Sequence, residues 1–301
     1  MKSAATKISM TSFKIKSLSL LSVLLISLMG SAGYAHALTP AKPLELAPHR
    51  AVYEMRLGDA DQNSGIVAVK GRMVFEFQGN ACDGYTQNMR FVTEIMDRRG
   101  KSTLTDLRSS SWEDGFGKRF RFNSQHYRDR NLQETIKGDA KRDLNKHDVD
   151  VALSKPKKQK LRLSDKVMFP NQHSVQLLRS AIEGKKVFQA RLYDGSEQGK
   201  KVFDTTTIIG NENTGNKSKL PVGIPNTKRL DGVQSWPVAI SYFEDGEAAG
   251  EGLPIYELGF RFYANGVSRN LLINYGDFSI RGALKEIEFF KADVCDGDTK
   301  N

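Results

Sequence analysis

Apolar and polar residues alternate one by one through most of this chain, and no other feature restricts its fold as strongly. The alternation is clearest in the ranges 51–57, 72–77 and 89–95, where one face of each segment is almost wholly apolar. A period of two with a single apolar face is typical of an antiparallel strand that is buried on one side. We therefore expect an all-β protein.

Less regular versions of the pattern raise the prediction to about fourteen antiparallel strands. The further strands are expected at 101–114, 118–130, 132–139, 148–154, 157–163, 186–194, 200–210, 234–243, 258–263, 268–275 and 278–290. Between the last three, Asn265-Gly266 predicts a type I′ turn and Gly276-Asp277 a type II′ turn. The alternation slips near Gly282, which predicts a β-bulge there.

One segment follows a different period and predicts the main helix, over residues 171–183. Val175, Leu178 and Ile182 recur there at helical spacing, with a proline just before the segment and a glycine just after it. Many strands around one helix imply a single open barrel or spiral. We expect those three apolar residues to face its interior.

The interior should also contain Phe75, Phe91 and Phe260, which lie on the apolar faces of predicted strands. Residues 211–233 are polar and rich in turn formers, so we expect a long loop there. That loop could instead separate two domains. We favour one β-spiral domain over residues 38–301.

The N-terminus has the three parts of a secretory signal peptide over residues 1–37. Four lysines and no acids precede the apolar stretch Leu18–Met29, and Ala35-His36-Ala37 forms a cleavage pattern before Leu38. The apolar stretch is short for a membrane anchor. No cysteine lies near the cleavage point to accept a lipid. We expect an exported protein that starts at Leu38.

Export also bears on the charge and on the partners. The formal net charge is +10, and four of the basic residues lie in the predicted signal peptide. The remaining excess is modest and does not indicate nucleic acid.

The chain contains two cysteines, Cys82 and Cys295. Export favours a disulfide between them, because disulfides form and persist outside the cytoplasm. A zinc site is a poor reading because zinc needs about four closely spaced ligands. A catalytic thiol would need a histidine partner, which the sequence alone leaves open.

Two charged segments could bind ligands. Ser154–Arg162 (SKPKKQKLR) could contact anionic lipid, lipopolysaccharide or a charged partner, or it could be a solvated hairpin tip. Glu244–Gly252 (EDGEAAGEG) has acids in a glycine-rich loop but lacks the spacing of a calcium-binding loop, so we expect no metal there.

No set of catalytic residues stands at a diagnostic spacing. We expect a packing or capping role for His49 and a core position for His126, while His147 and His173 belong to no motif. Asp194–Glu197 is typical of an exposed turn. We predict no enzyme activity and no cofactor, although catalytic sites can assemble from distant residues.

Several longer stretches carry a family resemblance. They are APHRAVYEMRL, SGIVAVKGRMVFEFQGNACDGYTQNMRFVTE, RLYDGSEQGKKV, WPVAISYF and GLPIYELGFRFYANGVSRNLLINYGDFSI. Over about residues 45–295 the chain resembles the EipB family of periplasmic cell-envelope integrity proteins from Gram-negative bacteria.

The resemblance implies an open spiral of antiparallel strands. It also implies one disulfide from a turn cysteine to a C-terminal cysteine, which correspond to Cys82 and Cys295. It implies a role in envelope integrity with a genetic link to a periplasmic tetratricopeptide-repeat protein, and it carries over no catalytic or ligand residues.

Two classes of function follow for this chain. The first is a non-enzymatic protein that maintains the envelope through a protein partner. The second is a carrier that holds a lipid or acyl chain inside the open barrel, an idea that rests on analogy between folds. An envelope hydrolase would need a convergent polar cluster in a pocket, which a sequence does not reveal.

Overall fold

The structure is a computed structural model that describes residue 44 and the ranges 46–143, 148–164, 166–213, 223–245 and 252–292. These residues belong to one compact unit that begins at Lys42. The predicted signal peptide, the start at Leu38 and Cys295 lie outside the described residues, so the predictions about them remain predictions.

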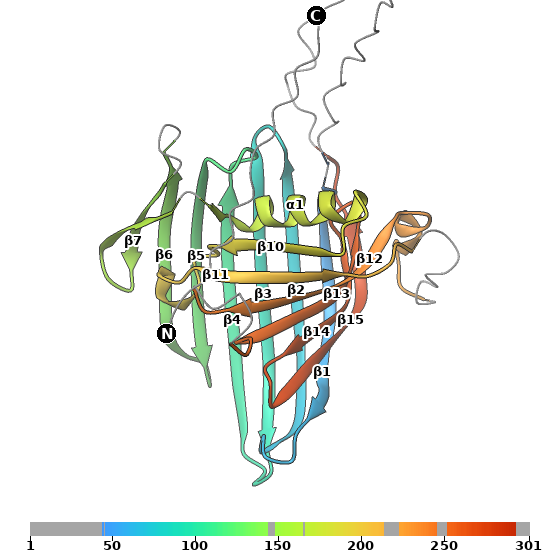
Figure 1. Cartoon of the computed structure of the whole chain (residues 1–301). Helices are drawn as coiled ribbons and strands as arrows, with labels where there is room; N and C mark the ends of the chain where they lie inside the picture. The colour runs from blue at the N-terminus through green and yellow to red at the C-terminus, as the bar shows by residue number, and fades with distance from the viewer. Residues whose placement is uncertain are drawn as a thin grey trace, which may run out of the picture. The chain divides into compact units, whose positions relative to one another are not determined.

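A single sheet contains the fifteen strands of the described residues (Figure 1). They are β1 (His49–Ala60), β2 (Ile66–Asn80), β3 (Gly84–Asp97), β4 (Ser102–Glu113), β5 (Arg119–Arg128), β6 (Asn131–Arg142), β7 (Val149–Lys155), β8 (Gln159–Leu163), β9 (Val167–Met168), β10 (Val187–Leu192), β11 (Phe203–Ile209), β12 (Ser235–Phe243), β13 (Tyr256–Tyr263), β14 (Ser268–Asn274) and β15 (Phe278–Phe289). The fourteen predicted strands are confirmed, and β9 is an additional one.

The order of the strands in the sheet follows their order in the sequence almost throughout. It runs β8-β7-β6-β5-β4-β3-β2-β1-β15-β14-β13-β12-β11-β10-β9, so nearly all neighbours in space are also neighbours in sequence. The exception joins the two ends of the sequence, where His49 of β1 pairs with Phe289 of β15. All pairs are antiparallel except β9 with β10. The all-β open spiral is therefore confirmed.

Local irregularities differ in part from the prediction. The pairing of β1 with β15 is irregular at two places. One is a bulge at Lys285, because Val52 pairs with Glu286 and Tyr53 with Leu284, and the other lies between Leu57 and Ala60 of β1. The expected position near Gly282 was wrong by three residues, since the sequence does not show the partner strand that sets the register.

The two predicted turns also had different outcomes. Gly276 has a φ of 89°, and only this first central residue of the turn has a positive φ, as a type II′ turn requires. At Asn265-Gly266 only Gly266 has a positive φ, and Tyr263 N donates to Val267 O at 2.9 Å. That pattern is a longer hairpin loop with a left-handed glycine, so the type I′ prediction was wrong.

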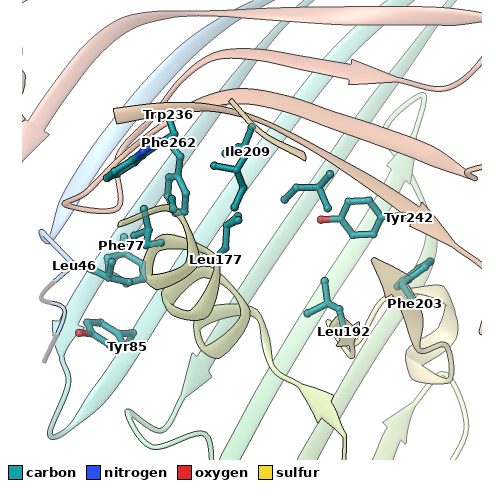
Figure 2. Packing of buried hydrophobic residues seen from close by; sticks show 14 residues of the cluster. Leu46, Phe77, Tyr85, Leu177, Leu192, Phe203, Ile209, Trp236, Tyr242 and Phe262 are labelled. Atoms are coloured by element: carbon teal, nitrogen blue, oxygen red, sulfur yellow. The ribbon is translucent and has the colours of Figure 1, made fainter. Parts of the chain in front are cut away.

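The helix α1 (Pro170–Ile182) packs against the inner face of the sheet. Leu177 and Leu178 are 1% and 0% exposed. In Figure 2 Leu177 projects from α1 toward Ile209 of β11, within the apolar cluster that also contains Phe77 of β2.

The predicted inner face of α1 was partly wrong. Val175 and Leu178 pack in this cluster, but Ile182 is 48% exposed. Ile182 is the last residue of the helix. Of the three predicted interior phenylalanines, Phe75 and Phe260 pack against the helix cluster. Phe91 packs against a second cluster, which is built around Tyr53, Met55 and Ile280.

Part of the predicted loop at 211–233 is ordered against the sheet. A short 3₁₀ helix, η3 (Thr227–Leu230), buries Leu230 in the second cluster, and Asn226 Nδ2 donates to Ile287 O at 3.0 Å. Residues 214–222 lie outside the described part of the chain. The single sheet includes strands from both sides of this loop, as expected.

In the described residues no strand pairing joins the two ends of the sheet, and side chains close the spiral along the seam between them. Tyr193 meets the rings of Phe120 and Phe122 edge-on, at centroid distances of 6.4 and 5.8 Å. A Cβ at Gly195 would lie 2.5 Å from the Phe122 ring, so only glycine fits there. The segment Asp194–Glu197 was expected to be an exposed turn, and that prediction was wrong for three of its four residues. Gly195 is buried in the seam, Asp194 and Ser196 are half-buried, and Glu197 is exposed.

Candidate functional site

The described residues bring buried polar side chains together at the N-terminus of α1. The N-cap residue is Phe169, whose side chain cannot accept a hydrogen bond, so the first N–H groups of the helix need an acceptor from elsewhere. Glu113, the last residue of β4, supplies it. Its Oε2 accepts from Asn171 N at 2.6 Å and its Oε1 from Gln172 N at 2.8 Å.

Neighbouring strands add further contacts to this helix-capping cluster. Arg142 of β6 donates from Nη2 to Val167 O at 2.6 Å and from Nε to Gly117 O at 3.2 Å. Its guanidinium lies 5.3 Å from the centroid of the Phe169 ring. Gln87 of β3 donates to Oδ1 of Asn171. The cluster therefore ties α1 to three strands of the sheet.

Two titratable groups here have perturbed pKa values. Burial raises the pKa of Glu113 to about 8, against the opposing effects of the two N–H donors and of nearby Arg142. Burial lowers the pKa of His173 to about 4. His173 Nε2–H donates to Thr205 Oγ1 at 3.1 Å, because the Thr205 hydroxyl itself donates to Ala190 O at 2.9 Å.

The other histidines are separate from this cluster. His49 is 1% exposed, donates from Nδ1 to Ala47 O at 2.7 Å and packs against Phe75, Phe77 and Phe289, which confirms a packing role. Burial lowers its pKa. His126 is half-buried on β5, so the expected core position was wrong. His147 lies outside the described residues.

Ser154–Arg162 forms the β7–β8 hairpin, and its lysines are exposed. In the Glu244–Gly252 segment, Glu244 is ion-paired with Lys201 at 2.5 Å and Asp245 with Arg191. Residues 246–251 are not described. No group of three or more potential metal ligands occurs in the described ranges.

Cys82 lies in the turn between β2 and β3. Asn80 Oδ1 accepts from both Cys82 N and Asp83 N at 2.8 Å, which fixes the turn. Gly115 of the neighbouring loop packs against Ala81, where a Cβ would lie 1.8 Å from Ala81 O. The turn is therefore a rigid anchor, and the disulfide to Cys295 stays a prediction.

Comparison with known proteins assigns the chain to a family. A family model described as EipB-like matches residues 40–291. The chain belongs to the EipB-like family. The cell envelope integrity protein EipB of Brucella abortus (strain 2308) is 39% identical over 259 residues, covering 86% of this chain and 90% of that protein.

A solved structure has a similar fold. It is a beta-barrel-like protein of a domain of unknown function from Brucella abortus, with a TM-score of 0.73 and 38% identity. The match covers 82% of this chain and 99% of the other.

Among the described residues, no helix has the length and apolar character needed to cross a membrane.

Sequence reasoning missed Glu113, the central residue of the helix-capping cluster. Glu113 shares the inner face of β4 with Ser109 and Ser111, so the polar run around it is typical of an exposed strand end. Only its distance to the helix in three dimensions shows its role.

Proposed function

We propose that this protein maintains the integrity of the cell envelope as a non-enzymatic binding protein of the periplasm. Membership of the EipB-like family and the name of its 39% identical relative support the envelope role. The predicted signal peptide supports the location.

The proposal that the protein is not an enzyme rests on the contacts of two buried side chains. Glu113 and His173, two buried groups with shifted pKa values, are engaged in contacts that hold α1 in the sheet. A catalytic acid or base needs to reach a substrate proton in a cleft. A carboxylate whose two oxygens cap a helix is instead positioned for stability.

We propose that the protein acts through a partner protein, and the family resemblance suggests a periplasmic tetratricopeptide-repeat protein.

The test begins with cells that lack the EipB-like protein described here, which should become sensitive to detergent and to cell-wall antibiotics. Wild-type protein and the variants Glu113→Gln and His173→Gln should restore resistance when their abundance is equal. Loss of protection by one variant that is folded and equally abundant would contradict the non-enzymatic role.

A lipid carrier is the second candidate, because apolar side chains on the inner face are only half-buried. Phe91, Ile273 and Phe278 are such residues at the edge of the second cluster. Mass spectrometry of organic extracts from natively purified protein separates the two candidates. A stoichiometric lipid would favour the carrier, and a lipid-free extract with a co-purifying repeat protein would favour the partner.

A further inference from the structure

Three consecutive hairpin tips at one end of the sheet are strongly basic. The β3–β4, β5–β6 and β7–β8 tips lie at the same end because antiparallel neighbours alternate in direction (Figure 1). Their eight basic residues, all exposed, are Arg98, Arg99, Lys101, Arg128, Arg130, Lys155, Lys157 and Lys158.

The acids in these tips bind backbone groups. Asp97 Oδ1 accepts from Arg99 N at 2.9 Å and from Lys101 N at 3.0 Å. Asp129 Oδ1 accepts from Leu104 N at 2.9 Å. The acids therefore shape the turns, although Asp97 also pairs with Arg99 at 3.7 Å and Arg98 donates to Gln62 O. The excess of exposed cations means that this end of the sheet attracts anions.

A cleft of about 490 Å³ lies beside the β7–β8 tip and continues this basic surface. It is formed by the start of β6, by the β7–β8 tip and by the 3₁₀ turn η1 (Glu197–Gly199). A Cβ at Gly199 would lie 2.6 Å from Leu153 Cδ2, so the glycine lets η1 sit directly on β7. Packing of η1 holds Gln198 and Lys200 opposite the lysines of the tip.

The residues that line the cleft define a ligand class. Three lysines and three glutamines surround it: Lys155, Lys157, Lys200, Gln133, Gln159 and Gln198. Ammonium groups bind phosphate as point charges, and carboxamides both donate to and accept from hydroxyl groups. The acid Glu134 also lines the cleft and can accept hydrogen bonds from sugar hydroxyls.

We propose that this cleft binds a saccharide that bears a phosphate group. The three lysines bind the phosphate, and the three glutamines bind the sugar hydroxyls. The volume lies within the range of small-molecule sites. The three glutamines are exposed in the cleft and offer both donors and acceptors, which sugar hydroxyls need and a lipid phosphate alone does not. This assignment goes beyond the proposed function and does not depend on it.

The test measures binding to natively processed protein by calorimetry, with glucosamine 6-phosphate, glucosamine and inorganic phosphate as probes. We expect the sugar phosphate to bind at least about tenfold more tightly than either fragment, since it uses both sets of donors. The double variant Lys157→Gln/Lys200→Gln should weaken this binding by about tenfold or more.

Two further variants serve as controls. Lys118→Gln/Lys228→Gln removes two exposed lysines outside the cleft and should leave binding unchanged. Gln159→Asn/Gln198→Asn shortens the hydroxyl-binding groups and should weaken the sugar phosphate but not inorganic phosphate. Asparagine also tolerates the left-handed backbone of Gln198, whose φ is 61°.

Three results would overturn the proposal. The first is equal binding of phosphate and sugar phosphate, and the second is equal weakening by both lysine pairs. The third is binding only to phosphatidylglycerol vesicles, which would indicate a membrane surface in place of a saccharide site. Unchanged thermal melting of each variant would show that lost binding does not come from unfolding.

Discussion

The carboxyl group of Glu113 gives the sharpest test of how the helix is held in the sheet. Its pKa is raised from 4.5 to about 8 by burial. A group with a raised folded pKa binds a proton more readily in the folded than in the unfolded chain. Its contribution is thus fully present below pH 4.5 and is lost as the pH rises toward 8.

The size of the effect follows from the shift. At about 1.4 kcal/mol per pH unit, the free energy of unfolding should fall by roughly 3 to 4 kcal/mol between pH 5 and pH 8 from this group alone. Glu113→Gln removes the titration, but its amide nitrogen cannot accept the second backbone N–H, so the variant loses one cap at every pH. The variant should therefore be less stable than wild type at pH 5, and its stability relative to wild type should rise by roughly 3 to 4 kcal/mol between pH 5 and pH 8.

Urea unfolding of both proteins at several pH values measures the difference. With an m value near 3 kcal/mol/M, the midpoint of the variant should move by about 1 M relative to wild type across this range. The exposed Glu94→Gln on the outer face of β3 is the matched control and should change stability by less than about 0.5 kcal/mol. Parallel pH curves for wild type and Glu113→Gln would refute the reasoning, as would a variant that loses stability relative to wild type as the pH rises.

Three other predictions follow from the buried residues and the cysteines. Leu178→Ala should lower the free energy of unfolding by about 2–5 kcal/mol, whereas the exposed Ile182→Ala should cost less than about 0.5 kcal/mol; equal effects would place the helix outside the core. Burial lowers the pKa of His173 to about 4, so its contribution to stability is complete above pH 6.5 and falls by about 3 kcal/mol as the pH drops toward 4. In the same urea assay, His173→Gln should reduce this fall in the free energy of unfolding at acid pH. The same fall in wild type and variant would count against a neutral buried histidine. Peptide mapping without reductant should recover Cys82 linked to Cys295, and two alkylatable thiols in native protein would contradict the disulfide.

The strands were predictable because the pattern of each strand lies within its own residues. A strand with one buried face has apolar residues two positions apart, and this alternation is visible in strands longer than about four residues. The strand β9 has two residues, Val167 and Met168, and is too short to show a period. Its position depends on pairing with Arg191 and Leu192, which the sequence does not reveal.

The helix was predictable in place but not in orientation. Helical spacing selected Val175, Leu178 and Ile182, yet Leu177 is also buried, because the surrounding sheet covers α1 on more than one side. A helix enclosed in this way buries a wider arc than one on a surface. The cap from Glu113 was unpredictable for the same reason, since it joins residues 58 positions apart.

The ends of the sheet explain why the seam matters for binding. In the described residues β8 pairs only with β7 and β9 only with β10, so no backbone ladder joins the two ends. The seam depends instead on packing such as Tyr193 against Phe122 and on single contacts such as Arg142 with Val167 O. Separating such a closure exposes apolar area, whereas separating two paired strands would also break a row of hydrogen bonds. Along this seam η1 rests on β6 and β7, and there the proposed saccharide cleft is lined from both ends of the sheet. A ligand that bridges the lysines of the β7–β8 tip and Lys200 would therefore also hold the seam closed.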